Sequence, residues 1–292
     1  MPTRNTAILL AFTASLAGCQ RSDTAANKDT AAESAPVANV VTVVAREYAF
    51  EMPDTIPAGL TRFELKDEGK EPHHLVVMKL EDGKKASDLF AAFKTMGPGG
   101  PGGPPPTWMH PVGGPNAPVA GGTANATLTL EPGEYAAFCV IPTPQGAPHI
   151  MMGMIKGFTV APAGSGAAAA AALPASDLTI TLRDYDFELS RPLTSGRHVI
   201  AVTNAGSQPH ELTIVRYREG ESNAKLVAWA EKPGGQVIPA YPMGGVTDIP
   251  PGKTVVIEND FPAGRYGFVC FTPDKKDGKP HFLHGMQKEF TI

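Results

Sequence analysis

The feature that most constrains the fold of this chain is an internal repeat. Tyr48 and His73 recur as Tyr185 and His210, in both cases 137 positions later. The separation of matching residues shortens only beyond Gly97–Pro106, a glycine- and proline-rich segment of the first copy. A constant separation that changes only at a loop-like insertion is typical of a duplicated domain. The chain is therefore predicted to contain two copies of one fold.

Each copy has the pattern of a β-rich domain. One helix is expected in each: Ser87 precedes the first, over 88–94, and the second is expected between Ser222 and Lys232. These features predict an all-β chain of two Greek-key β-sandwich domains in tandem, each with one short helix. The β-branched or alternating runs of the first copy, bounded by glycine and proline, are 41–45, 48–52, 61–65, 74–80, 126–130 and 135–139.

The N-terminal residues resemble an export signal. Arg4 precedes a short apolar run and small residues, and Leu16–Cys19 resembles the lipobox of bacterial lipoproteins. This resemblance implies a signal peptide over 1–19 and lipidation of Cys19. It also implies a lipid-anchored location outside the cytoplasm, at the outer membrane facing the periplasm or at the cell surface. An ordinary cleaved signal with an unrelated cysteine is the alternative.

Composition indicates where the linkers and domains lie and which kinds of partner are not expected. The polar segment 20–38 is predicted to be a disordered tether, and the Ala/Pro/Gly-rich segment 161–176 a linker, which leaves domains at 39–160 and 177–292. The net charge of −4 and the lack of a basic stripe argue against a nucleic-acid partner. No second long apolar run occurs, so the membrane is an expected partner only through Cys19.

Both copies carry the same candidate metal ligands at matching positions. They are His73, Cys139, His149 and Met154 in the first copy and His210, Cys270, His281 and Met286 in the second. Two imidazoles and one thiolate, with a weak axial thioether, form the ligand set of blue copper. The predicted cofactor is therefore copper, at most one ion per domain. A disulfide between Cys139 and Cys270 is the alternative, although equivalent positions of separate domains seldom approach within about 7 Å.

The surrounding motifs resemble those of cupredoxins such as plastocyanin, pseudoazurin and azurin. The matching segments are Pro72–Val77 and Pro209–Ile214 for the first-histidine strand, Gly133–Cys139 and Gly264–Cys270 for the cysteine strand, and Gly153–Val160 and Gly285–Ile292 for the closing strand. The resemblance covers both domains and implies cupredoxin-like sandwiches with type 1-like copper sites, each formed by two histidines, one cysteine and one methionine.

The sequence departs from this family in one loop. Nine residues separate the cysteine from the second histidine in the first copy, and ten do so in the second, more than is usual in the family. Prolines at 142, 144, 148, 273 and 280 are expected to stiffen these loops and to reduce the entropy of closing them.

The predicted function is electron transfer outside the cytoplasm by a membrane-anchored copper protein, and a redox protein is a candidate partner. Copper storage or delivery, or a metal-free cupredoxin-fold binding module, are the alternatives. Catalysis is not expected. Multicopper oxidases and copper nitrite reductases need further histidines in His-x-His or His-Cys-His arrangements, and this sequence contains neither.

Overall fold

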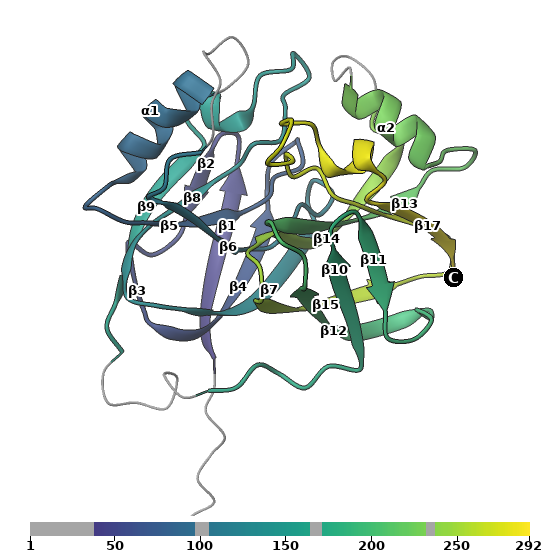
Figure 1. Ribbon diagram of the computed structural model, residues 1–292, viewed down its shortest axis with the longest axis horizontal. Coiled ribbons are helices and arrows are strands. Elements are labelled where there is room, and N and C mark those ends of the chain that lie inside the picture. Colours follow the sequence, from purple (N-terminus) through teal and green to yellow (C-terminus); the bar gives the residue numbers. More distant parts are fainter. Residues whose placement is uncertain (1–37, 97–104, 164–170, 232–236) are drawn as a thin grey trace, which may run out of the picture. The chain divides into compact units, whose positions relative to one another are not determined.

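β-Strands dominate the computed structural model, which describes residues 38–96, 105–163, 171–231 and 237–292 (Figure 1). These residues belong to one compact unit, Ala35–Ile292. The signal segment with Cys19, the tether, and much of the segments 97–106 and 161–176 lie outside the described residues. None of the described helices is both long and apolar enough to cross a membrane.

The first copy is a two-layer sandwich. One layer pairs β2 (Ala49–Glu51), β1 (Asn39–Arg46), β4 (Gly59–Asp67) and β7 (Thr123–Leu130), in that order. The second layer has the order β3 (Thr55–Pro57), β9 (Ile155–Ala161), β8 (Gly133–Phe138), β5 (Val76–Leu80) and β6 (Met109–Gly113). β1 pairs with β4 in parallel, as β3 does with β9, and the other neighbours are antiparallel.

The second copy repeats this arrangement. Its first layer has the order β11 (Asp186–Leu189), β10 (Leu178–Arg183), β12 (Gly196–Asn204) and β15 (Thr254–Phe261). Its second layer has the order β14 (Ala240–Ile249), β13 (His210–Tyr217), β16 (Arg265–Val269) and β17 (Gln287–Thr291). The predicted fold class, tandem all-β sandwiches with one α-helix in each copy, is confirmed.

The two first layers form one continuous sheet. β7 and β15 pair at Thr127 and Val256, so eight strands run from β11 to β2 (Figure 1). Next to this junction Arg62 Nη1 lies 2.7 Å from Glu258 Oε1. Asn125 also exchanges two hydrogen bonds with the backbone of Glu258, at 2.8 and 2.9 Å. The sequence pattern did not anticipate this shared sheet.

Period-two burial places the core between the layers. In β1 the side chains of Val41, Val43 and Ala45 are buried, and their neighbours in the strand are more exposed. Fully burying one such aliphatic side chain contributes about 1.5–3 kcal/mol. The same core cluster contains Cys139 and Cys270, so both thiols sit in rigid, close-packed surroundings.

Each copy has one α-helix against its second layer. They are α1 (Ala86–Met96), which buries Leu89, and α2 (Asn223–Glu231), which buries Leu226. Ser87 was expected to cap the first helix but lies inside it. The carboxylate of Asp88 instead accepts a hydrogen bond from the Lys85 backbone N–H at 2.9 Å, which satisfies a donor at the helix start.

Candidate metal centres

Antiparallel pairing brings the first histidine and the cysteine of each copy to the same end of a sheet. His73 lies just before β5 and Cys139 just after β8, and these strands pair with Val76 opposite Phe138. In the second copy His210 opens β13 and Cys270 follows β16, with Thr213 opposite Val269.

In the first copy the nine-residue loop folds into a small hairpin. Pro142 and Pro148 pair as an isolated antiparallel bridge, and the Thr143 N–H donates to the Ala147 carbonyl at 2.8 Å. The base of this hairpin returns the chain to the strand end. There the Ile150 N–H donates to the Cys139 carbonyl at 2.7 Å. The tip of the hairpin, at Pro144 and Gln145, is exposed, and His149 at its base lies beside Cys139.

The second copy uses the same device. Pro273 and Pro280 form the bridge, Asp274 N–H donates to the Lys279 carbonyl at 2.8 Å, and Phe282 N–H donates to the Cys270 carbonyl at 2.9 Å.

A short 3₁₀ helix then carries the second histidine of each copy. These are η1 (His149–Met152) and η3 (His281–His284), each ended by a glycine with φ near +100°, Gly153 or Gly285. This left-handed conformation strongly favours glycine and turns the chain into the closing strand.

Two groups of three side chains result, which we call the first centre (His73, Cys139, His149) and the second centre (His210, Cys270, His281). All six side chains have no exposed surface. The two Nδ1 atoms of each centre lie 3.0 Å apart. The cysteine Sγ lies 3.5 Å from the nearer Nδ1 in the first centre and 3.3 Å in the second. Both cysteines are free thiols, so the disulfide alternative is not realised.

These donors fit a copper ion. Metal bonds of about 2.0–2.3 Å to nitrogen and sulfur separate neighbouring donors by roughly 3–4 Å, which is the spacing seen here. In each centre the two ring nitrogens that face each other are both Nδ1. That arrangement leaves the buried Nε2 atoms of His73 and His281 without a hydrogen-bond partner among the described residues. A shared ion at the Nδ1 atoms accounts for this orientation, and the soft thiolate with imidazoles selects copper.

Carboxylates hold the opposite side of some imidazole rings. His149 Nε2 lies 2.8 Å from Glu71 Oε2, and His210 Nε2 lies 2.8 Å from Asp184 Oδ1. Such a partner fixes the ring orientation and directs Nδ1 toward a metal. His73 and His281 have only more distant carboxylates, Glu47 at 3.9 Å and Asp274 at 3.6 Å.

Glycines and tyrosines restrict the same rings. A Cβ atom on Gly69 would lie 2.6 Å from His73 Nε2, and one on Gly206 would lie 2.6 Å from His210 Nε2. Only glycine allows this close approach. Tyr48 meets the His149 ring edge to face at 5.1 Å, and Tyr185 meets His281 at 5.6 Å.

Burial sets the protonation of the metal-free centres. It lowers the pKa of His73 and of His281 to about 4 and raises the pKa of the Cys139 thiol to about 12. The pKa of Cys270 is raised for the same reason. At neutral pH the imidazoles are therefore neutral and ready to bind a metal. The thiols carry protons, which a bound ion has to displace.

The predicted axial ligands Met154 and Met286 are fully buried beside these centres. The backbone N–H of Cys139 donates a hydrogen bond to the Met154 carbonyl, and that of Cys270 donates one to the Met286 carbonyl, both at 3.2 Å. Their role as thioether ligands stays a prediction.

Sequence reasoning missed a polar network where the copies meet. His74 and Glu211 occupy matching positions directly after the first histidines, and both are buried. His74 Nε2 accepts a hydrogen bond from the Val140 N–H at 2.9 Å, and Glu211 accepts one from the Phe271 N–H at 2.7 Å. Between them Asn116 donates to Thr213 at 2.9 Å and to Glu211 at 3.4 Å. The repeat spacing of 137 residues identified His74 and Glu211 as equivalent positions, but it did not predict that both belong to one polar network.

Known proteins were compared with the chain. No protein-family profile and no curated protein matches it. Among solved structures, reduced auracyanin from Roseiflexus castenholzii is 21% identical, over 43% of this chain and 98% of auracyanin, with a TM-score of 0.30. The Cu-containing nitrite reductase of Thermus scotoductus is 15% identical, over 80% of this chain and 58% of the reductase, with a TM-score of 0.25. A blue copper oxidase from Nitrosomonas europaea is 13% identical, over 86% and 84% of the two chains, with a TM-score of 0.21.

The two paired β-sandwiches, each with a buried His-Cys-His group, form a tandem cupredoxin-like fold, as predicted. The donor sets of both copies fit copper, as predicted. The expectation that this chain is not an enzyme is contradicted, because the similar structures include a nitrite reductase and an oxidase.

Proposed function

We propose that this protein binds one copper ion in each copy and transfers electrons outside the cytoplasm, held at a membrane through a lipid on Cys19. The observation that carries this proposal is the duplication of a preformed donor set. In both copies two Nδ1 atoms and one Sγ atom converge in a fully buried position at the end of a β-sandwich.

The frame suits one-electron chemistry. Copper, when bound, supplies a Cu(II)/Cu(I) couple, and the thiolate and imidazoles suit both states. The protein's own contribution is to keep the donors in place and to exclude water. The hairpin bridges, the 3₁₀ helices and the Glu71 and Asp184 contacts hold the rings before a metal arrives. A site fixed in this way need not rearrange when the electron moves. We also place Met154 and Met286 as weak axial thioether ligands.

Copper loading of the reduced full-length protein tests the proposal. With Cu(II), we expect two ions per chain and an intense visible thiolate-to-copper band. Cys139→Ser and Cys270→Ser should each remove the share of the band that belongs to one centre. Failure to bind Cu(II) or Cu(I) would rule out copper binding.

Copper storage or delivery is the second candidate, and one observation favours it. Met151 and Met152 follow His149 in η1 and are 39% and 51% exposed, so thioethers lie at the surface beside the first centre. Tight Cu(I) binding without the Cu(II) thiolate band, lost in the double variant Met151→Leu/Met152→Leu, would support this function instead.

A further inference from the structure

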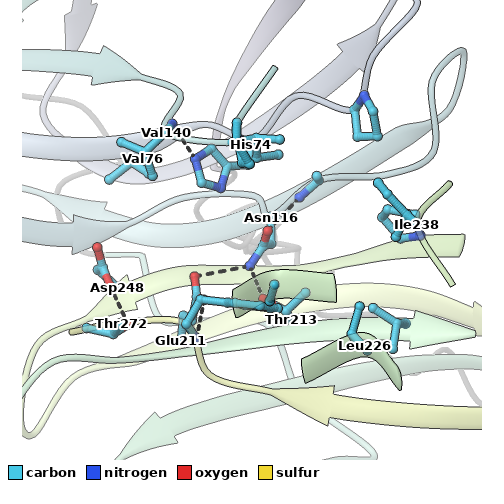
Figure 2. A pocket seen from close by; sticks show the side chains of 18 of the residues that line it. His74, Val76, Asn116, Val140, Glu211, Thr213, Leu226, Ile238, Asp248 and Thr272 are labelled. Carbon is cyan, nitrogen blue, oxygen red and sulfur yellow. Dashed lines mark hydrogen bonds between the residues drawn. The ribbon is translucent and has the colours of Figure 1, made fainter. Parts of the chain in front are cut away.

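A cavity of about 260 Å³ lies where the two copies meet (Figure 2). Both copies contribute to its wall, through segments that continue directly from the metal centres. The wall includes the residue that follows each of four predicted ligands: His74, Val140, Glu211 and Phe271. The cavity is therefore adjacent to both centres but contains none of their ligands.

Most of the cavity wall is apolar, and part of it is aromatic. α2 supplies Leu226, Trp229 and Ala230, and Phe271 comes from the loop after β16. Valine, isoleucine and proline side chains from both copies supply most of the remaining wall. Ligand cavities generally range from about 300 to 1,000 Å³, so this one has room for a single ring and little more.

Hydrogen-bonding groups spread from the left of the view, where Asp248 and Thr272 lie, to Glu211, Asn116 and Thr213 near its centre (Figure 2). The Asn116 amide donates to Thr213, and the Thr272 hydroxyl donates to Asp248 Oδ1 at 2.7 Å. Both oxygens of Glu211 already accept hydrogen bonds, from Phe271 N–H and from Asn116. The Thr213 side chain also hydrogen-bonds Glu211, whereas the Asp248 carboxyl group can accept a further bond beside the one from Thr272. One acceptor is thus available in the cavity wall.

Charge narrows the class of ligand. Among the described residues that line the cavity there is no lysine or arginine, and two carboxyl groups are present, so an anion is disfavoured. A bare ammonium would have to lose its water shell against mainly apolar walls, which costs several kcal/mol. We propose that this cavity binds a small uncharged molecule made of one aromatic ring and one hydroxyl group. The ring packs against Trp229 and Phe271, and the hydroxyl donates to Asp248.

Benzyl alcohol titrated into the metal-free, reduced protein tests this inference independently of copper. Backbone amide NMR should show saturable shifts centred on Val140, Ala230 and Phe271. Toluene, which lacks the hydroxyl, and benzylamine, which carries the charge, should each bind about tenfold more weakly. No saturable shift, or equal or tighter binding of toluene or benzylamine, would overturn the proposal.

Variants locate the site. Ala230→Phe fills the cavity from α2 and should abolish the shifts, whereas Ala228→Phe, at an exposed position of the same helix, should leave them unchanged. Asp248→Leu removes the acceptor and should weaken benzyl alcohol about tenfold with little effect on toluene. This second variant covers the case in which Ala230→Phe does not fold. Unchanged benzyl alcohol binding in Asp248→Leu, or in folded Ala230→Phe, would contradict the assignment.

Discussion

The two centres have the same donors but different supports. In the first centre the loop histidine, His149, has the close carboxylate, Glu71. In the second centre it is the upstream histidine, His210, that has one, Asp184. Position 208, which matches Glu71, is glutamine, and its amide donates to Asp274 at 2.8 Å. Duplication has therefore kept the ligands and exchanged the groups behind them.

This difference implies that the centres are not equivalent as copper sites. A carboxylate behind an imidazole raises its basicity and fixes its orientation, and losing such a partner typically costs 10–100-fold in metal affinity. In the second centre Asp274 is held by Tyr185 and Gln208, at 2.6 and 2.8 Å, and stands 3.6 Å from His281. We expect the centres to differ in affinity and reduction potential, although their ligand types are identical.

The largest expected effect concerns the two histidines without a close carboxylate. Their pKa falls to about 4 in the folded, metal-free protein, against about 6.5 when unfolded. Below pH 6.5 the unfolded chain therefore binds protons that His73 and His281 do not. Stability is complete above pH 6.5 and is lost as the pH falls toward 4, by on the order of 3 kcal/mol for each histidine.

Chemical denaturation of metal-free protein between pH 7.5 and 4, with histidine NMR, measures this loss. His149 and His210 should take up protons at higher pH than His73 and His281. Stability that does not change between pH 7 and 4.5 would contradict the prediction.

Gly206→Ala should weaken copper binding in the second centre alone. The new Cβ would collide with the His210 ring, and overpacking of this kind costs about 1–3 kcal/mol, or roughly 10–100-fold in affinity. Copper competition titrations on single-centre proteins, made with Cys139→Ser or Cys270→Ser, measure each site separately. Gly264→Ala is the matched control, because its Cβ would meet only the flexible Arg216 side chain. Equal losses at both centres would refute the steric argument.

Glu71→Gln should weaken copper binding in the first centre about 10–100-fold and leave the second unchanged. The substitution keeps the side-chain size but removes the charge behind His149 Nε2. Gln208→Glu is the reciprocal variant and places a carboxyl at the matching position of the second centre. If Glu71→Gln had no effect on affinity or reduction potential, the Glu71 contact would be incidental.

Asp184→Asn should weaken the second centre more than Glu47→Gln weakens the first. These carboxylates occupy matching positions, but Asp184 lies 2.8 Å from its histidine and Glu47 lies 3.9 Å away. We expect about tenfold for Asp184→Asn and only a small change for Glu47→Gln, by the same titration. A larger loss of affinity in Glu47→Gln than in Asp184→Asn would show that the carboxylate–histidine distance does not determine copper affinity.

Most strands and all the candidate ligands could be predicted from the sequence, because their signals are local or are repeated in the two copies. Period-two burial and turn residues marked the strands, and the spacing of 137 marked His73 and His210 as equivalent. The ligand types pointed to copper because few chemistries combine histidine, cysteine and methionine in this way.

The remainder depends on contacts between distant segments. An edge strand such as β7 has the same alternation whether water or β15 lies beside it, so the shared sheet left no signal. The hairpins between each cysteine and its second histidine are closed by the bridges Pro142–Pro148 and Pro273–Pro280. The sequence shows these prolines but does not show which of them pair. Glu71 and Asp184 read as surface acids until the fold places them behind imidazoles.

The most direct test of the central claim is copper K-edge X-ray absorption on protein with both centres loaded. The account predicts, for each copper, one short bond to sulfur and two bonds to imidazole nitrogen. It also predicts that the short-sulfur contribution halves in Cys139→Ser and disappears in the double variant with Cys270→Ser. Copper bound only by nitrogen and oxygen, or a short sulfur bond that survives the double variant, would contradict it.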